Sequence, residues 1–266
     1  MRLNVTHVTK YQYDAQVPYA LQQLRMTPKS RAGQTVVTWD VRVEGGRKEL
    51  EFDDQHNNHV VLVSIEPDRP DITFVCEGVV ETTDNAGVIG KHGGFTPVWL
   101  FTRPTDLTRP GTLTRNLAKT IGTGFDDDVQ RLHALSHAIA DRVRYETSRT
   151  DPETSAEDAL QAGHGVCQDH AHIFVTAARY MGFPARYVSG YLMMNDRVDQ
   201  DASHAWAEAH LDGVGWIGFD VSNGISPDGR YVRVATGLDY KDAAPVSGMR
   251  FGDSTENMTV SLQVQQ

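Results

Sequence analysis

The spacing of apolar residues changes twice along this chain, and this change limits the possible folds more than any other feature. Over residues 2–83 apolar side chains mostly alternate with polar ones, as they do in half-buried strands. Over residues 113–181 they recur every three or four positions, as in helices packed on one side, and alternation then returns over residues 185–221. The pattern predicts an α+β protein, with a β-rich N-terminal domain followed by a core of helices and antiparallel strands.

The first part, residues 1–83, is predicted to form an antiparallel β-sandwich-like domain. Its β-branched and aromatic runs are separated by clusters of Pro and Gly. The predicted strands cover the region from Leu3 to Tyr11 and residues 36–43, 59–65 and 72–80. Cys76 lies in the last strand, in register with Ile72 and Phe74, so we expect its thiol to be buried and unreactive.

Three further segments follow. Residues 84–110 are rich in Gly and Pro, which predicts a connecting segment. Residues 111–245 carry the helical pattern and the later strands, and are expected to form the core. Residues 246–266 are predicted to contain a closing strand, because apolar residues alternate between Met258 and Val264.

Cys167 stands at the start of a predicted helix of about four turns. Apolar residues recur at helical spacing after it until Gly182 and Pro184 end the pattern. The first N–H groups of a helix have no partner and its dipole is positive there, so this position favours a thiolate over a thiol. The sequence therefore predicts a reactive nucleophile at Cys167.

A hairpin downstream can supply a base and an orienting carboxylate. Residues 203–210 alternate as a half-buried strand does, with His204 and Trp206 on one face, and residues 216–221 form its predicted partner. If the connecting loop holds three residues, His204 faces Ser222, and Asp220 lies diagonally across the same face within reach of the imidazole.

These motifs resemble the bacterial transglutaminase-like cysteine proteases. The resemblance rests on three blocks in order: residues 165–172 (GVCQDHAH), 182–191 (GFPARYVSGY) and 204–206 (HAW). It implies a β-rich N-terminal region and a papain-like, transglutaminase-like catalytic core, in which the helix bearing the Cys packs on the antiparallel sheet bearing the His and Asp. One departure is that Val221-Ser222 stands where family members commonly have Pro-Thr.

The resemblance implies a Cys-His-Asp triad of Cys167, His204 and Asp220 that cleaves an amide through a thioester. Papain-like enzymes take a second oxyanion donor from a side chain upstream of the cysteine, and Tyr145 and Gln161 are the candidates. No metal or organic cofactor is implied. His133 and His137 are four residues apart, but no zinc-protease motif surrounds them.

Two outcomes are possible for the thioester, and the sequence favours hydrolysis of a peptide or isopeptide bond over transfer to an amine. A transferase needs a sheltered, aromatic-walled path, and Trp206 is the one wall that the sequence places near the cleft. It could equally shield the pair of His204 and Asp220 from solvent. A peptide-binding module without turnover is the alternative from another class, and it predicts loss of a triad residue, whereas all three are present.

The amino-acid composition limits the classes of molecule that this protein is expected to bind. The chain has 35 acidic and 25 basic residues and no cluster of Lys and Arg, which argues against nucleic acid. The expected partner is a peptide or protein substrate. The acidic loop over residues 193–202 must pass near the cleft and hints that this substrate bears an amine, although a charge run of this kind is more often a solvated loop. No apolar run is long enough to cross a bilayer, and the first residues lack a signal-peptide core, so we expect no membrane partner, a cytoplasmic location and reduced thiols.

Two further features are expected to be structural. Residues 154–157 (TSAE) have the form of a capping box, with Thr154 and Glu157 opening a short helix. Arg186, at the start of the strand after the Cys167 helix, is expected to form an ion pair with Asp169 more readily than to line the cleft.

The two thiols are predicted to differ in reactivity, since one opens a helix and the other lies in a buried strand. Iodoacetamide at neutral pH should label Cys167 much faster than Cys76 in the folded protein, as measured by mass spectrometry of the labelled peptides. Equal rates, or faster labelling of Cys76, would contradict the assignment of Cys167 as the nucleophile.

Overall fold

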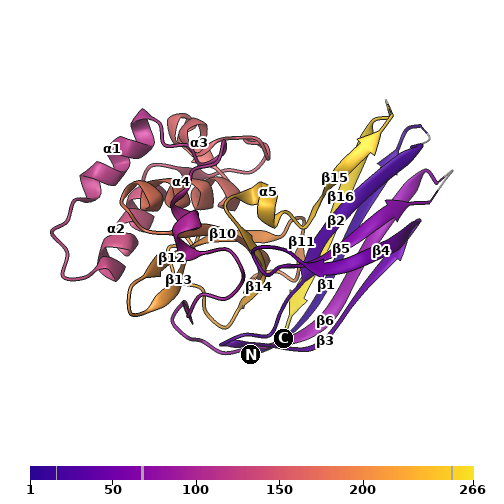
Figure 1. The fold of residues 1–266 in the computed structure, drawn as a ribbon, viewed down its shortest axis with the longest axis horizontal. Helices are drawn as coiled ribbons and strands as arrows, with labels where there is room; N and C mark the ends of the chain where they lie inside the picture. The colour runs from indigo at the N-terminus through magenta and orange to yellow at the C-terminus, as the bar shows by residue number, and fades with distance from the viewer. Residues whose placement is uncertain (16, 67–68, 253) are drawn as a thin grey trace.

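The structure is a computed structural model that describes residues 1–15, 17–66, 69–252 and 254–266. Figure 1 shows a layered β-structure beside a core in which helices cover a separate sheet. This arrangement confirms the predicted α+β class. Among the described residues, no helix combines the length and apolar character needed to cross a membrane.

Two sheets face each other in the β-structure. The first has the strand order β11-β16-β1-β6-β3, and the second has the order β15-β2-β5-β4. The strands of the first sheet are β1 (Arg2–Tyr13), β3 (Gln34–Glu44), β6 (Asp71–Thr82), β11 (Asp199–Gln200) and β16 (Glu256–Gln265). Those of the second are β2 (Tyr19–Thr27), β4 (Gly46–Asp53), β5 (His59–Ile65) and β15 (Val246–Phe251).

The four strands predicted in the N-terminal part correspond to β1, β3, β5 and β6, whereas β2 and β4 were not predicted. Every residue of β4 is exposed or only partly buried, so no inward apolar face marks it in the sequence. In β2 the pair Gln22 and Gln23 interrupts the alternation. Both strands exist because neighbouring strands pair with them.

Residues 246–266 form two strands rather than the single predicted closing strand. β15 pairs with β2, and β16 pairs with β1, so the C-terminus adds one strand to each sheet. Figure 1 shows both yellow C-terminal strands lying among the indigo and purple N-terminal ones. The β-sandwich is therefore built from both ends of the chain.

Buried side chains from the two sheets fill the space between them, including Leu24, Val63 and Phe74. Cys76 is fully buried among them, and this burial raises the pKa of its thiol to about 12. A thiol in this environment stays protonated at neutral pH, as expected for an unreactive cysteine.

The predicted connecting segment, residues 84–110, packs against the core. Its strand β7 (Val88–Gly90) pairs with the edge of the core sheet, and its 3-10 helix η1 (Val98–Thr102) buries Phe101. The Phe101 ring lies edge-on to Trp216, with 5.1 Å between the ring centroids. This segment thus covers part of the sheet that carries the site.

The core sheet has the order β14-β10-β12-β13-β7. Its longer strands are β10 (Ala185–Leu192), β12 (His204–Leu211), β13 (Gly215–Phe219) and β14 (Tyr231–Gly237). The helices of the core are α1 (Thr112–Ile121), α2 (Asp128–Ala140), α3 (Ala156–Ala162), α4 (Cys167–Tyr180) and α5 (Tyr240–Ala243), and a short parallel pair consists of β8 (Arg144–Tyr145) and β9 (His164–Gly165).

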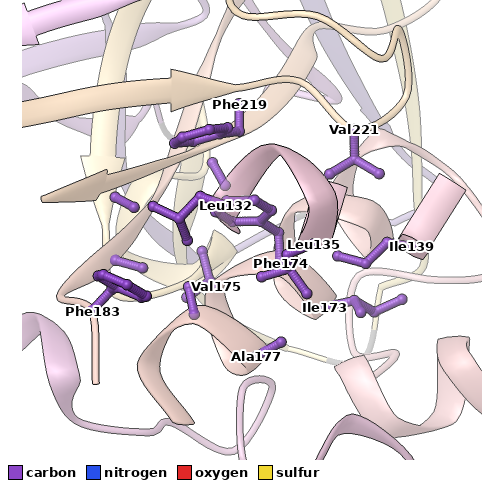
Figure 2. Close-up of a cluster of buried hydrophobic side chains, with 14 of the residues drawn as sticks. Leu132, Leu135, Ile139, Ile173, Phe174, Val175, Ala177, Phe183, Phe219 and Val221 are labelled. Atoms are coloured by element: carbon purple, nitrogen blue, oxygen red, sulfur yellow. The ribbon is translucent and has the colours of Figure 1, made fainter. Parts of the chain in front are cut away.

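Helix α4 is the central helix of the core, since it contacts α1, α2, α3 and strand β12. Figure 2 shows its residues Phe174 and Val175 in one cluster with Leu132 of α2 and Phe219 at the end of β13. The rings of Phe174 and Phe219 stack at a centroid distance of 4.9 Å. This packing fixes where α4 begins relative to the hairpin formed by β12 and β13.

The predicted capping box is shifted by one residue. Ser155 is the N-cap of α3, its hydroxyl accepts from the N–H of Asp158, and Thr154 instead hydrogen-bonds to Asp151. Glu157 reaches across to the start of α1, where its carboxylate accepts from the N–H groups of Leu113 and Thr114. A side chain of α3 therefore caps the N-terminus of α1.

Replacing Glu157 by Ala leaves the first N–H groups of α1 without this acceptor, and we expect a loss of about 1–2 kcal/mol in the free energy of unfolding. The matched control is Glu153→Ala, which removes an exposed ion pair with Lys241 and should change stability by less than about 0.5 kcal/mol. Burial opposes ionisation of Glu157, but these hydrogen bonds lower its pKa overall. The contribution is therefore present at neutral pH and is lost as acid protonates the carboxylate, which urea unfolding at several pH values would measure.

Candidate active site

Cys167 is the first residue of α4, as predicted, and a nearby carboxylate fixes this helix end. Asp169 accepts hydrogen bonds from the N–H of Val166 at 2.8 Å and from the hydroxyl of Thr150 at 2.7 Å. A side chain at Gly165 would meet the Asp169 carboxylate, because a Cβ there would lie 2.6 Å from its oxygen. Glycine at this position therefore allows the Asp169 carboxylate to lie against the backbone that leads into Cys167.

His204 is the first residue of β12 and lies against Asp220. The distance between His204 Nε2 and Asp220 Oδ2 is 2.6 Å, and both side chains are buried. The hairpin turn holds three residues, since Leu211 pairs with Gly215. The condition on the loop length is therefore met, and the diagonal placement of Asp220 relative to His204 follows from this register.

Two more groups hold the Asp220 carboxylate. Asn223 donates from its side-chain amide at 2.7 Å, and the Tyr231 hydroxyl donates at 2.7 Å, both to Oδ2. The N–H of Asn223 donates to the other oxygen at 3.2 Å, so Asp220 also caps the turn that follows it. Burial would raise the pKa of Asp220, but these hydrogen bonds and the one with His204 lower it, so the carboxylate is ionised.

The imidazole of His204 is held in one orientation. Its Nε2 is occupied by Asp220, which leaves Nδ1 as the nitrogen available to Cys167, the thiol that lines the same cleft. Burial would lower the pKa of His204, but the hydrogen bond to Asp220 and the proximity of Cys167 outweigh it and raise the pKa to about 10. This interaction stabilises the fold fully below about pH 6.5 and is lost as the pH rises through about 10.

The residues that replace Pro-Thr after Asp220 attach the turn to the helix that carries the thiol. Val221 is buried in the helical core, and the Ser222 hydroxyl lies 2.8 Å from His170 Nδ1. His170 Nε2 lies 2.9 Å from the carbonyl oxygen of Val143, so this nitrogen carries the proton. Ser222 must then donate to Nδ1. A histidine of α4 thus connects the turn to the chain that enters β8.

A cleft of about 660 Å³ leads to the thiol. Its lining includes Tyr145, Gln168, Tyr187 and Tyr240 besides Cys167 and His204, together with part of the segment between β10 and β12, which was predicted to pass near it. From that segment come Met194, Arg197, Gln200, Asp201, Ala202 and Ser203.

Tyr145 reaches the cleft because β8 pairs in parallel with β9, which places Tyr145 beside Gly165. It lines the cleft together with Cys167 and is 52% exposed. Burial of the hydroxyl and the neighbouring sulfur raise the pKa of Tyr145 to about 12, so it is a donor at neutral pH. The other upstream candidate, Gln161, is exposed on α3 and does not line the cleft.

Trp206 lies behind the imidazole and outside the cleft lining. It is 2% exposed, with its ring 6.2 Å from that of His204 and 5.4 Å from that of Tyr231, between centroids. Of the two roles predicted for it, this position fits the shield and not the substrate wall. Asn223 and Tyr231 were not predicted as site residues. The turn motif that contains Asn223 offered a signal, whereas the sequence around Tyr231 offered none.

The predicted ion pair between Arg186 and Asp169 is wrong. Arg186 instead pairs with Glu208, with 2.6 Å between Nε and Oε2, and its guanidinium lies 3.8 Å from the Trp216 ring centroid. The cause is sheet register, because Arg186 and Glu208 are direct cross-strand partners on β10 and β12.

Of the two histidines considered for a metal, His133 is part of the packing and His137 is exposed. The His133 ring contacts Phe219 edge-on, with 5.0 Å between centroids. Within the described ranges, no three His, Cys, Asp or Glu side chains are grouped as a metal site would require. The position of His133 is therefore explained by core packing.

Two family models match parts of this chain. Residues 115–221 match the transglutaminase-like superfamily core, and residues 3–81 match the bacterial transglutaminase-like N-terminal region. An uncharacterized protein of Mycobacterium leprae, ML0607, is 27% identical over 99% of this chain and 98% of its own length. The uncharacterized Rv2569c of Mycobacterium tuberculosis is also 27% identical, over 99% of this chain and 91% of its own length.

Among solved structures, a candidate cysteine protease from Cytophaga hutchinsonii has the same fold. Its TM-score is 0.79 at 23% identity, and the match covers 100% of this chain and 91% of that one. The family resemblance predicted from the three sequence blocks is confirmed by these matches.

Replacing Asp220 by Asn tests its orienting role. The amide has nearly the same shape but no charge, so the wrong imidazole tautomer becomes accessible, and we expect turnover to fall by orders of magnitude with the fold intact. Without the Asp220 charge, less remains to offset the lowering effect of burial on the pKa of His204. This pKa should therefore fall from about 10 toward its ordinary value, as measured by NMR of the imidazole.

Tyr231→Phe is the matched control, since it keeps the carboxylate and removes one donor to it; its turnover should fall much less. If Asp220→Ala kept full activity, Asp220 would be a turn cap alone.

Proposed function

This chain carries a transglutaminase-like core joined to a bacterial transglutaminase-like N-terminal region, and from that premise we propose that it is a thiol-dependent acyl-transfer enzyme that cleaves an amide bond. The observation that carries the proposal is the convergence of three groups at one cleft: the thiol of Cys167 at a helix start, the imidazole of His204, and the carboxylate of Asp220 at 2.6 Å from that imidazole.

The proposed reaction has two steps, acylation of Cys167 and hydrolysis of the thioester. Each step forms one bond to the carbonyl carbon, breaks another and passes a proton through His204. Nδ1 of His204 holds the proton from Cys167, and the sulfur attacks the carbonyl carbon of the amide. His204 then gives this proton to the leaving nitrogen as the C–N bond breaks, which leaves a thioester and a free amine. In the second half, water loses a proton to His204 and attacks the thioester, which releases the acid and restores the thiol. Asp220 fixes the imidazole throughout.

Two donors are available to the carbonyl oxygen as it becomes negative. The N–H of Cys167 is the first of its helix and has no intrahelical partner. The hydroxyl of Tyr145, which stands beside the sulfur, is the proposed second donor. Removing one donor of this kind from other enzymes costs about 10²- to 10³-fold in turnover, so Tyr145→Phe has a measurable expected effect.

The shape of the cleft favours hydrolysis over transfer to an amine. Transfer requires that water be kept from the thioester, whereas here Tyr145, a cleft residue near the sulfur, is half exposed to solvent. The tyrosines that line the cleft give it aromatic walls, so amine transfer stays the alternative.

The charge of the cleft gives little support to an amine-bearing substrate. Of the aspartates in the segment between β10 and β12, Asp201 lines the cleft, and Arg197 lines it too. Asp199 is turned to the sandwich, where it accepts from Gln263. We therefore propose a peptide or isopeptide substrate without a requirement for positive charge at this wall.

The fate of the thioester tests the proposed hydrolysis. The acyl-enzyme is formed on Cys167 with an activated ester and offered millimolar lysine-like amines in water, and the products are quantified by mass spectrometry. We expect free acid to dominate and to stay unchanged as the amine is raised, because water reaches the thioester directly. Cys167→Ser serves as the control for labelling elsewhere.

Products dominated by the new amide would establish transfer instead. Failure of Cys167 to acylate with any of a panel of acyl electrophiles, in a folded protein, would favour the peptide-binding module and overturn the enzymatic proposal.

A further inference from the structure

A second cavity lies on the far side of Trp206 from the cleft, between the sandwich and the core sheet. Its volume is about 50 Å³, room for a few water molecules or one small ion. The sandwich contributes Arg31, the connecting segment contributes Asn85, and the core contributes Trp206, Tyr231 and Arg233.

The edges of this cavity are tied together by hydrogen bonds. Gln34, next to Arg31 in the lining, accepts from the N–H of Arg233 at 2.8 Å and donates to its carbonyl oxygen at 2.9 Å. Gln34 also donates to the carbonyl oxygen of Lys29 at 3.0 Å. The cavity therefore lies where hydrogen bonds join β3 of the sandwich to β14 of the core sheet.

The charges in and beside the cavity do not balance. Glu208, beside the lining, is fully buried and pairs with two arginines, Arg186 and Arg233, at 2.6 Å each. Arg31, which lines the cavity and is partly exposed, adds a third guanidinium, while the carboxylate of the lining, Asp228, is already paired with Arg230. Three guanidinium groups thus share the one carboxylate of Glu208, and positive charge shielded from water is costly unless a counter-ion is bound.

Two of the lining side chains also have donors to spare. Within the described ranges, Arg31 pairs with no carboxylate, and its one hydrogen bond runs from Nε to the carbonyl oxygen of Lys29 at a long 3.5 Å. Trp206 is 2% exposed, and its indole N–H finds no acceptor among the described residues. Burial lowers the pKa of Arg31 to about 10, which still leaves it charged at neutral pH. Indole and guanidinium groups donate and cannot accept, so a ligand here must supply acceptors.

We propose that this cavity is a binding site for a small oxyanion, a phosphate-sized ion or the carboxylate of a small acid, held by Arg31, Arg233 and the indole N–H of Trp206. Guanidinium groups present paired donors that match the oxygens of such anions. The size of the cavity selects a small group over a nucleotide or a peptide.

The site shares two side chains with the catalytic pair. Trp206 packs on His204, and Tyr231 donates to Asp220, while both line this cavity. It is nevertheless separate from the cleft, since neither Trp206 nor Tyr231 is part of the cleft lining. Anion binding does not depend on the proposed amide chemistry and can be measured in the Cys167→Ser protein.

Isothermal titration at constant ionic strength tests the proposal, with sodium phosphate, sodium sulfate and sodium acetate each titrated against a chloride background. We expect saturable one-site binding in the wild-type chain. Arg31→Gln should weaken it about tenfold or more, because a charge-assisted contact is lost. Arg109→Gln, which removes the same charge from an exposed surface pair with Asp106, should leave it unchanged. Preference for phosphate and sulfate, or for acetate, identifies which anion class the cavity takes.

Trp206→Phe provides a second test that keeps both the ring packing and the arginines. It should weaken binding while its circular dichroism spectrum and melting temperature stay close to those of the wild type. The proposal is overturned if none of the three anions binds saturably, or if Arg31→Gln, shown to be folded, binds as tightly as Arg109→Gln. A rise in melting temperature that is linear in salt and equal in all variants would likewise count against it, because excluded salts stabilise any protein in that way.

Discussion

The carboxylate of Asp220 is the group on which the geometry of the site depends. A buried ionised carboxylate is stable only when its oxygens are satisfied, and here the donors come from three directions: His204 on the neighbouring strand, Asn223 in the following turn and Tyr231 on β14. The same contacts that compensate the charge therefore fix the imidazole. Stability and catalytic orientation share one set of hydrogen bonds.

Those parts of the site that depend on local pattern could be predicted from the sequence. The start of α4 follows from helical spacing and terminating residues, and the register of the hairpin follows from strand alternation and a three-residue turn. Together they place Cys167, His204 and Asp220 on the elements that carry them. Local chemistry was enough because the hairpin brings two of the three groups together without help from distant sequence.

The parts that depend on contacts between distant segments could not be predicted. Tyr145 reaches the thiol through a two-residue parallel pairing, and Arg186 chooses Glu208 over Asp169 because of cross-strand register. Strand β4 has no buried face to reveal it and exists because β5 pairs with it. In each case the missing information was the identity of the neighbouring strand. The periodicity of a sequence does not contain this information.

The sandwich also shapes the cleft directly. The segment between β10 and β12, which forms one wall of the cleft, contains β11, and this short strand pairs with β16 through Asp199 opposite Gln263 and Gln200 opposite Leu262. Gln200 in turn donates to the carbonyl oxygen of Leu192 at the end of β10. Since β16 also pairs with β1, the wall is anchored to a sheet made from both ends of the chain. A change in the sandwich at this edge would therefore move residues that line the cleft, so the N-terminal region is physically coupled to the wall of the cleft and is not a separate attachment.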